Sequence, residues 1–359
     1  MTLSRRKALG LAAGISAAPH LALAETDVNN MQTALDLGYR AGLLNGLHAV
    51  YLLEAGDLVL EAYFEGEDEN WGRPLGQRSF GPNARHDIRS VTKSVTSLVY
   101  AIALDQGLVP APDAPLLASF PEYPDLADND RRRSWTVAHA LNMTLGTSWN
   151  ESLPYSDPRN SEIGMEIADD RYRFVLAHDP IDPPGTYWNY NGGATALIGA
   201  LIERGTGKNL ADYAQEVLFD PLGIGDAEWN AGRDGVHSAA SGLRLTAPEL
   251  ARIGELVRQE GVWQGTQIVP QDWVTLISTP QITTAFGSEY SHFWWLTRQY
   301  ARGSDTPLSM LHAAGNGGQR LYILPELDLT MVVFAGAYNR PDDWMTPTLV
   351  LQRIVLANV

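Results

Sequence analysis

The sequence predicts an α+β fold, in which an antiparallel sheet is flanked by helices and a mainly helical domain is inserted between two parts of the sheet. Strand-like runs gather in two places, near residues 48–66 and again near 319–338. Between them the sequence is rich in proline, aspartate and short helical patterns. We therefore expect the sheet domain to comprise residues 25–110 and 245–359, and the mainly helical domain to comprise residues 111–244.

Taken in order, the first half of the chain begins with an amphipathic helix over residues 31–47. Two strand-like runs follow, joined by the hairpin signal Ala55-Gly56-Asp57. The apolar stretch 89–107, RSVTKSVTSLVYAIALDQG, predicts a helix that ends at its C-terminal glycine. Short helices are expected inside the insertion, for example over 134–146 and 194–207.

The second half of the chain contains the remaining elements expected for the sheet domain. Residues 243–261 predict a helix with a proline near its start. Two strands are expected at 319–327 and 329–338, joined by a turn at Pro325-Glu326. Residues 346–358 predict a final helix.

Composition excludes several kinds of protein. The 359 residues are 45% hydrophobic, which suffices for a large core, and acidic residues outnumber basic ones by 16. The one basic run, at 131–133, lies beside aspartates and predicts a solvated loop, so no nucleic-acid partner is expected. Cysteine is absent, which excludes disulfides and thiol chemistry. The eight histidines have no metal-ligand spacing, so we expect neither a metal nor another cofactor.

The N-terminus is typical of an exported protein. Residues 1–24 have a charged start, a short apolar stretch and the small-residue site Ala22-Leu23-Ala24, and SRRKALG resembles a twin-arginine signal. We predict a signal peptide of the twin-arginine type at 1–24 and a periplasmic or secreted protein without membrane insertion after cleavage. The alternative is an unstructured cytoplasmic N-terminus.

Ser90 and Lys93 predict nucleophilic chemistry. The chain has three lysines among 26 basic residues, and one of them stands three residues after Ser90 in an apolar helix. Positions i and i+3 share a helix face, and burial disfavours a charged amine, so Lys93 is expected to have a lowered pKa and to act as a base. Arginine stays protonated and cannot replace it. In the alternative interpretation, Lys93 lies at the helix edge and extends to solvent.

These residues, with two further motifs, resemble the serine β-lactamase and penicillin-binding-protein group in its class C-like branch. That branch includes D-peptidases, esterases and 6-aminohexanoate-dimer hydrolases. Its S-x-x-K motif stands here as SVTK, Ser90 to Lys93. Counting from Pro184-Gly185-Thr186, its Y-x-N tyrosine falls on Tyr190, with Gly192 in place of the asparagine. A literal Y-x-N also begins at Tyr187, three residues out of register, and in a third interpretation both tyrosines only pack the loop.

The third motif of that group, K-T-G or H-x-G, aligns with His312-Ala313-Ala314. The motif's glycine is absent at that register, and Gly315 follows directly. The departures at the second and third motifs favour the esterase and amidase branch over a true β-lactamase. The aromatic stretch 293–295 either lines an acyl pocket or fills the core.

The resemblance implies a role for each residue. Ser90 would form the acyl-enzyme, Lys93 and Tyr190 would act as base and acid, and the backbone N–H groups of Ser90 and Gly315 would form the oxyanion hole. The predicted substrate contacts are Asn191, His312 and Asn316, although a lone strand histidine is more often structural.

Three functions remain open from the sequence. The first is a serine hydrolase acting on a small ester, amide or peptide-like substrate. The second is a β-lactamase or D-alanyl peptidase. The third, from another class, is an inactive binding protein on the same fold. The sequence makes no prediction of oligomeric state.

Overall fold

The computed structural model describes residues 27–225 and 227–359. The predicted signal peptide at 1–24 lies outside the described residues. No helix in the described part of the chain has the length and apolar character needed to cross a membrane.

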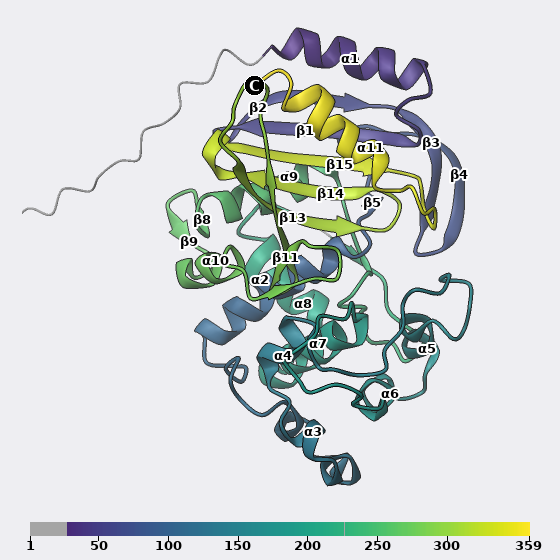
Figure 1. Cartoon of the computed structure of the whole chain (residues 1–359), viewed down its shortest axis with the longest axis vertical. Helices are drawn as coiled ribbons and strands as arrows, with labels where there is room; N and C mark the ends of the chain where they lie inside the picture. Colours follow the sequence, from purple (N-terminus) through teal and green to yellow (C-terminus); the bar gives the residue numbers. More distant parts are fainter. Residues whose placement is uncertain (1–26, 226) are drawn as a thin grey trace, which may run out of the picture.

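An eight-stranded antiparallel sheet forms one half of the molecule (Figure 1). Its strand order is β10-β11-β12-β13-β14-β15-β1-β2, so the N-terminal hairpin is added to the edge strand of the C-terminal meander. The strands are β1 (Leu47–Glu54), β2 (Asp57–Tyr63), β10 (Ile282–Thr283), β11 (Glu289–Ser291), β12 (Trp294–Gln299), β13 (Leu308–Gly315), β14 (Gln319–Leu324) and β15 (Leu329–Ala335).

Helices cover both faces of this sheet. One face packs against α1 (Val28–Arg40), α11 (Met345–Leu349) and the π-helical turns Val350–Val355, and their apolar side chains form a separate core cluster. The other face packs against α2 (Val91–Asp105) and α9 (Ala247–Arg258). The predicted α+β class, with an antiparallel sheet flanked by helices, is confirmed.

The segment between α2 and α9 is mainly helical and lies below the sheet in Figure 1. Its longest helix, α7 (Gly192–Thr206), packs against α2, so α2 is enclosed between the sheet and the helical part. The shorter helices are α3 (Asp130–Arg133), α4 (Val137–Leu141), α5 (Ser161–Ile167), α6 (Arg171–Ala177) and α8 (Leu210–Ala214).

Smaller elements complete the fold. A three-stranded sheet joins β5 (His86–Asp87), β7 (Leu243–Leu245) and β6 (Glu228–Trp229), and it brings the segment before α2 next to the segment before α9. Two-stranded ribbons and one helix remain: β3 (Glu65–Asn70) with β4 (Arg73–Ser79), β8 (Val262–Trp263) with β9 (Thr266–Gln267), and α10 (Gln271–Ile277).

Candidate active site

Ser90 stands at the N-cap of the buried helix α2. Serine at this position usually accepts a hydrogen bond from the first helical turn, but the Ser90 side chain makes no such cap. The preceding residue, Arg89, has a φ of 50°, in the left-handed region that a non-glycine residue rarely adopts. The helix therefore begins, after a strained turn, with a hydroxyl that is not used for capping.

Lys93 points at that hydroxyl. Its Nζ donates to Ser90 Oγ at 3.0 Å and to the backbone oxygen of Ala240 at 2.9 Å. The residue is 2% exposed, so the alternative in which its amine extends to solvent is wrong. Because α2 lies between the sheet and α7, the amine is held next to Ser90 on the same helix face.

Tyr190 is the tyrosine that reaches this pair. Its ring lies beside both residues: Lys93 Nζ is 4.9 Å from the ring centre, and its hydroxyl interacts electrostatically with Ser90 and with Lys93. Tyr187, the alternative, is 63% exposed and borders a separate surface hollow. The tyrosine found by counting from the Pro-Gly-Thr turn, Tyr190, is therefore the one that lies beside Ser90.

The expected lowering of the Lys93 pKa is wrong. Burial acts to lower it, but attraction to the Tyr190 oxygen and to the carboxylates of Glu162 and Glu151 outweighs burial, and the pKa is raised above its ordinary value. Burial raises the pKa of Tyr190, with Lys93 opposing that effect. The expectation failed because these two acidic side chains come from a loop and a helix far from Lys93 in sequence.

Gly315 ends β13 directly beside the segment that leads into Ser90. A Cβ added to Gly315 would lie 2.4 Å from the backbone oxygen of Ile88 and 3.1 Å from Arg89 Cβ. The close approach of the two backbones therefore requires glycine. The next residue, Asn316, lines the cavity in front of Ser90, and its Oδ1 accepts from the backbone N–H of Asn339 at 2.8 Å.

Two of the predicted substrate contacts are placed elsewhere. The Asn191 side chain caps α7, accepting from Ala194 N at 2.9 Å and donating to Thr147 Oγ1 at 3.3 Å. Its polar atoms are thus engaged within the protein, which argues against contact with substrate. His312 lies between Trp295 and Tyr322, and both its ring nitrogens are buried with no hydrogen-bond partner among the described residues. This environment is that of a packed ring.

The residues of the aromatic stretch 293–295 lie in two different environments. Phe293 and Trp294 are buried in the core, as the core interpretation requires. Trp295 instead joins an aromatic cluster behind Tyr190, where it stacks at 6.5 Å and also contacts Trp188. The cluster therefore packs against the ring of Tyr190.

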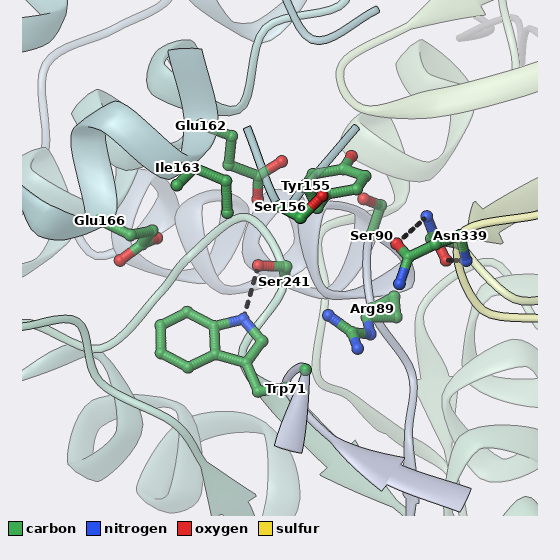
Figure 2. Close-up of a pocket in the computed structure, with 12 residues that line it drawn as sticks. Trp71, Arg89, Ser90, Tyr155, Ser156, Glu162, Ile163, Glu166, Ser241 and Asn339 are labelled. Atoms are coloured by element: carbon green, nitrogen blue, oxygen red, sulfur yellow. Dashed lines mark hydrogen bonds between the residues drawn. The ribbon is translucent and has the colours of Figure 1, made fainter. Parts of the chain in front are cut away.

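A cavity of about 360 Å³ opens in front of Ser90 (Figure 2). Its walls come from the helical part, the β3–β4 ribbon and the end of β13. Figure 2 shows Tyr155 and Glu162 on one side, and Trp71, whose indole donates to Ser241 at 3.0 Å, on the other. This size suits a small organic substrate. The lining residues are Trp71, Gly72, Arg89, Ser90, Tyr155, Ser156, Glu162, Ile163, Glu166, Ser241, Asn316 and Asn339.

Sequence reasoning missed the acidic pair Glu151 and Glu162. Burial and the neighbouring Glu162 raise the pKa of Glu151 to about 8. The chain has 42 acidic residues, and nothing local distinguishes these two. The available signal was indirect: Gly192 stands where the second motif has an asparagine, so another polar group had to serve that side of the site.

In the described part of the chain, one group of side chains has the spacing to hold a metal ion. His48, Asp68 and His86 are buried, with candidate ligand atoms within 4.8 Å of one another. However, His48 Nδ1 and His86 Nε2 share a hydrogen bond of 2.9 Å, and His48 Nε2 packs against the backbones of Gly66 and Gly336. This is the geometry of a hydrogen-bonded histidine pair, and it lies outside the cavity lining.

Comparison with known proteins identifies the family of the chain. The family described as Beta-lactamase matches residues 45–352. The 6-aminohexanoate-dimer hydrolase of Paenarthrobacter ureafaciens is 26% identical over 288 residues, which cover 73% of this chain and 69% of that protein. The esterase EstB of Burkholderia gladioli is 30% identical over 164 residues, which cover 42% of this chain and 41% of that esterase.

A solved structure shares the fold. The crystal structure of a family VIII carboxylesterase superimposes with a TM-score of 0.66 at 16% identity, covering 91% of this chain and 97% of that one. With the family match over most of the chain and the Ser90–Lys93–Tyr190 cluster at the cavity, the assignment follows. The chain belongs to the beta-lactamase family of serine hydrolases.

Proposed function

We propose that this protein cleaves a small ester or amide through an acyl-enzyme on Ser90. The observation that carries the proposal is the 3.0 Å hydrogen bond between Lys93 Nζ and Ser90 Oγ at the edge of a cavity, with the ring of Tyr190 4.9 Å from the same nitrogen. A nucleophile, proton-transfer groups and space for a substrate are what acyl transfer needs.

The proposed reaction has two stages, acylation of Ser90 and hydrolysis of the acyl-enzyme. The Ser90 oxygen bonds to the substrate carbonyl carbon while its proton passes to the Lys93–Tyr190 pair. The bond to the leaving alcohol or amine then breaks, and Tyr190 returns the proton to it. Water attacks the acyl-enzyme carbonyl and gives one proton to the Lys93–Tyr190 pair. The bond to the Ser90 oxygen then breaks, the pair returns the proton to that oxygen, and the acid leaves. The N–H groups of Ser90 and Gly315 stabilise the oxyanion, and one such donor is worth about 3 kcal/mol.

The substrate class rests on the relatives and on Gly192. The P. ureafaciens relative is named for hydrolysis of an amide-linked dimer and the B. gladioli relative as an esterase. Gly192 cannot supply the carboxamide that the resemblance implies for a β-lactamase or D-alanyl peptidase. We therefore favour short esters and amides over β-lactams and cell-wall peptides.

The decisive experiment compares the protein lacking residues 1–24 with its Ser90→Ala variant on p-nitrophenyl acetate, a short p-nitroanilide and a chromogenic cephalosporin. Hydrolysis of the ester or anilide that Ser90→Ala abolishes supports the proposal. Full activity in a folded Ser90→Ala protein would refute it. Preference for the cephalosporin would indicate a β-lactamase, and no acylation of Ser90 by any of them would indicate a binding protein.

We propose further that the protein is periplasmic or secreted, on the basis of the twin-arginine-like leader. Expressed in a bacterium with a working twin-arginine system, the full chain is expected in the periplasmic fraction with Glu25 as its first residue. Replacing Arg5 and Arg6 by lysine should leave the protein uncleaved in the cytoplasm. Cytoplasmic retention of the unaltered chain would contradict the proposed location.

A further inference from the structure

The tip of the β3–β4 ribbon is a two-residue turn made of Trp71 and Gly72. Asn70 pairs with Arg73, so these two residues alone lie between the strands. Their φ values are 48° and 85°. Two successive positive φ values are those of a type I′ turn, whose first position is usually asparagine, aspartate or glycine. Tryptophan is a bulky residue for that position, and its backbone is therefore strained.

Packing in the core does not account for tryptophan at this position. In the part of the chain that the structure describes, Trp71 belongs to neither of the two apolar core clusters. Its side chain is half-buried and lines the cavity in front of Ser90, next to Gly72. A strained residue whose side chain takes no part in the core, and lies at a functional cavity, indicates a role for that side chain in the cavity.

The backbone of Trp71 is tied to the segment that carries the nucleophile. Its N–H donates to Asp87 Oδ2 at 2.6 Å. The other oxygen of Asp87 accepts from the backbone N–H of Arg89 at 3.2 Å, directly before Ser90. Asp87 is fully buried, so these bonds are shielded from solvent. One carboxylate therefore fixes the position of the turn relative to Ser90.

The indole of Trp71 is held by a second segment, the loop between β6 and β7. Its Nε1 donates to Ser241 Oγ at 3.0 Å. In the same loop, Asn230 Nδ2 donates to Asn70 Oδ1 at 2.9 Å. Because the indole N–H is already used within the protein, the part of the ring that lines the cavity is apolar.

The facing wall of the cavity is formed by Tyr155 and Ile163. Figure 2 shows them, with Glu162, on the side of the cavity opposite Trp71. The cavity volume of about 360 Å³ is near the lower end of the range for ligand pockets. A substrate group that fills this cavity from Ser90 therefore contacts the indole.

We propose that Trp71 is a specificity-determining residue, whose indole contacts the substrate and limits the size of the apolar group that the cavity accepts. This inference rests on the proposed function, because the group in question belongs to an ester or amide bound at Ser90. It goes beyond that function by restricting the substrates to small members of the class and by naming the residue that restricts them.

The test compares Trp71→Asn with the unaltered protein on two series of esters. Asparagine suits the first position of a type I′ turn, so this variant removes the indole and relieves the strained backbone. The first series is p-nitrophenyl acetate, butyrate and octanoate, in which the acyl group lengthens. The second series is phenyl acetate and 2-naphthyl acetate, in which the leaving alcohol becomes larger.

The measured quantity is the ratio of kcat/KM for the largest ester to kcat/KM for the smallest ester in each series. We expect this ratio to rise at least about tenfold in one series, because removing the indole relieves a steric contact in the pocket. The series that responds identifies the end of the substrate that lies against Trp71. Unchanged or lower ratios in both series overturn the proposal.

Leu75→Asn is the matched control. Leu75 is an exposed residue on β4 of the same ribbon and borders a different hollow, so the change replaces a large apolar side chain by the same amide away from Ser90. Both ratios should stay at the values of the unaltered protein. A rise equal to that in Trp71→Asn would show a general loosening of the ribbon and would overturn the specific role of Trp71.

Trp71→Gly covers a Trp71→Asn protein that fails to fold. Glycine adopts positive φ without strain and also removes the indole, so the same rise in one ratio is expected. Unchanged ratios in a folded Trp71→Gly protein overturn the proposal in the same way.

Labelling separates this proposal from the function on which it rests. Intact mass after reaction of the unaltered protein with a fluorophosphonate reports whether Ser90 is nucleophilic. If Ser90 is labelled and the esters are hydrolysed, unmoved ratios refute only the role of Trp71. If the unaltered protein is neither labelled nor active on any of these esters, the proposed function fails, and the role of Trp71 fails with it.

Discussion

Lys93 Nζ donates a hydrogen bond to Ser90 Oγ at 3.0 Å from one turn further along the same buried helix. The nitrogen is enclosed between the sheet and α7, where it also donates to the backbone oxygen of Ala240 and lies 4.9 Å from the centre of the Tyr190 ring. Replacing Lys93 by methionine keeps the side-chain volume but removes the amine that donates to Ser90 Oγ. We expect kcat/KM on p-nitrophenyl acetate to fall by about 10³-fold, within the range for proton-transfer groups. A fall of less than threefold in a folded variant would contradict the assignment.

Tyr190 and Tyr187 form a matched pair for mutation. Tyr190→Phe removes the hydroxyl that interacts with Ser90 and Lys93 and should lower kcat/KM by about 10² to 10⁴-fold. Tyr187→Phe removes an exposed hydroxyl away from Ser90 and should change kcat/KM by less than about twofold. The reverse pattern would show that the literal Y-x-N motif carries the chemistry.

Gly315→Ala tests the close contact beside the nucleophile. The added Cβ would lie 2.4 Å from the backbone oxygen of Ile88, so the end of β13 must move away from Ser90. Since a displaced oxyanion donor costs about 3 kcal/mol, we expect kcat to fall by roughly 10² to 10³-fold. Gly81→Ala, which meets nothing within 4 Å, is the control and should keep full activity.

His312 predicts a change of stability with pH. Burial, helped by Arg320, lowers the pKa of His312 to about 3 from an ordinary value of 6.5. As the pH falls below 6.5 the unfolded chain gains a proton at His312 and the folded chain does not, so stability is lost between pH 6.5 and 3. His312→Phe removes this loss. Urea unfolding should show the variant stabilised by about 2 kcal/mol more at pH 5 than at pH 7.5. An equal difference at both pH values would show that His312 does not titrate in this way.

Elements with strong local patterns could be predicted from the sequence. The β1–β2 hairpin, α2, α9 and the β14–β15 pair each have alternation, helical periodicity or clear terminating residues, and all are present. The first helix was expected over 31–47 but spans Val28–Arg40, because the chain turns at Gly42 and Gly46, both in the left-handed region. The ribbon β3–β4 could not be predicted, since EGEDEN has no apolar alternation and pairs through its backbone.

Some residues of the candidate site could likewise be predicted from the sequence, and others could not. Ser90 and Lys93 lie on one helix, so their spacing alone placed them together. Tyr190 could be placed by its distance from a Pro-Gly-Thr turn. Glu151, Glu162 and Trp71 could not, because only the packing of the helical part and the β3–β4 ribbon around α2 brings them to the cavity or to Lys93. The sign of the Lys93 pKa shift was wrong for the same reason.

The measurement that tests the central claim most directly is intact-protein and peptide mass spectrometry after brief reaction with a fluorophosphonate. We predict one adduct per chain, located on Ser90, and loss of ester hydrolysis in proportion to labelling. An unlabelled protein that still hydrolyses the ester, or an active protein whose label lies on another residue, would contradict the assignment of Ser90 as the nucleophile.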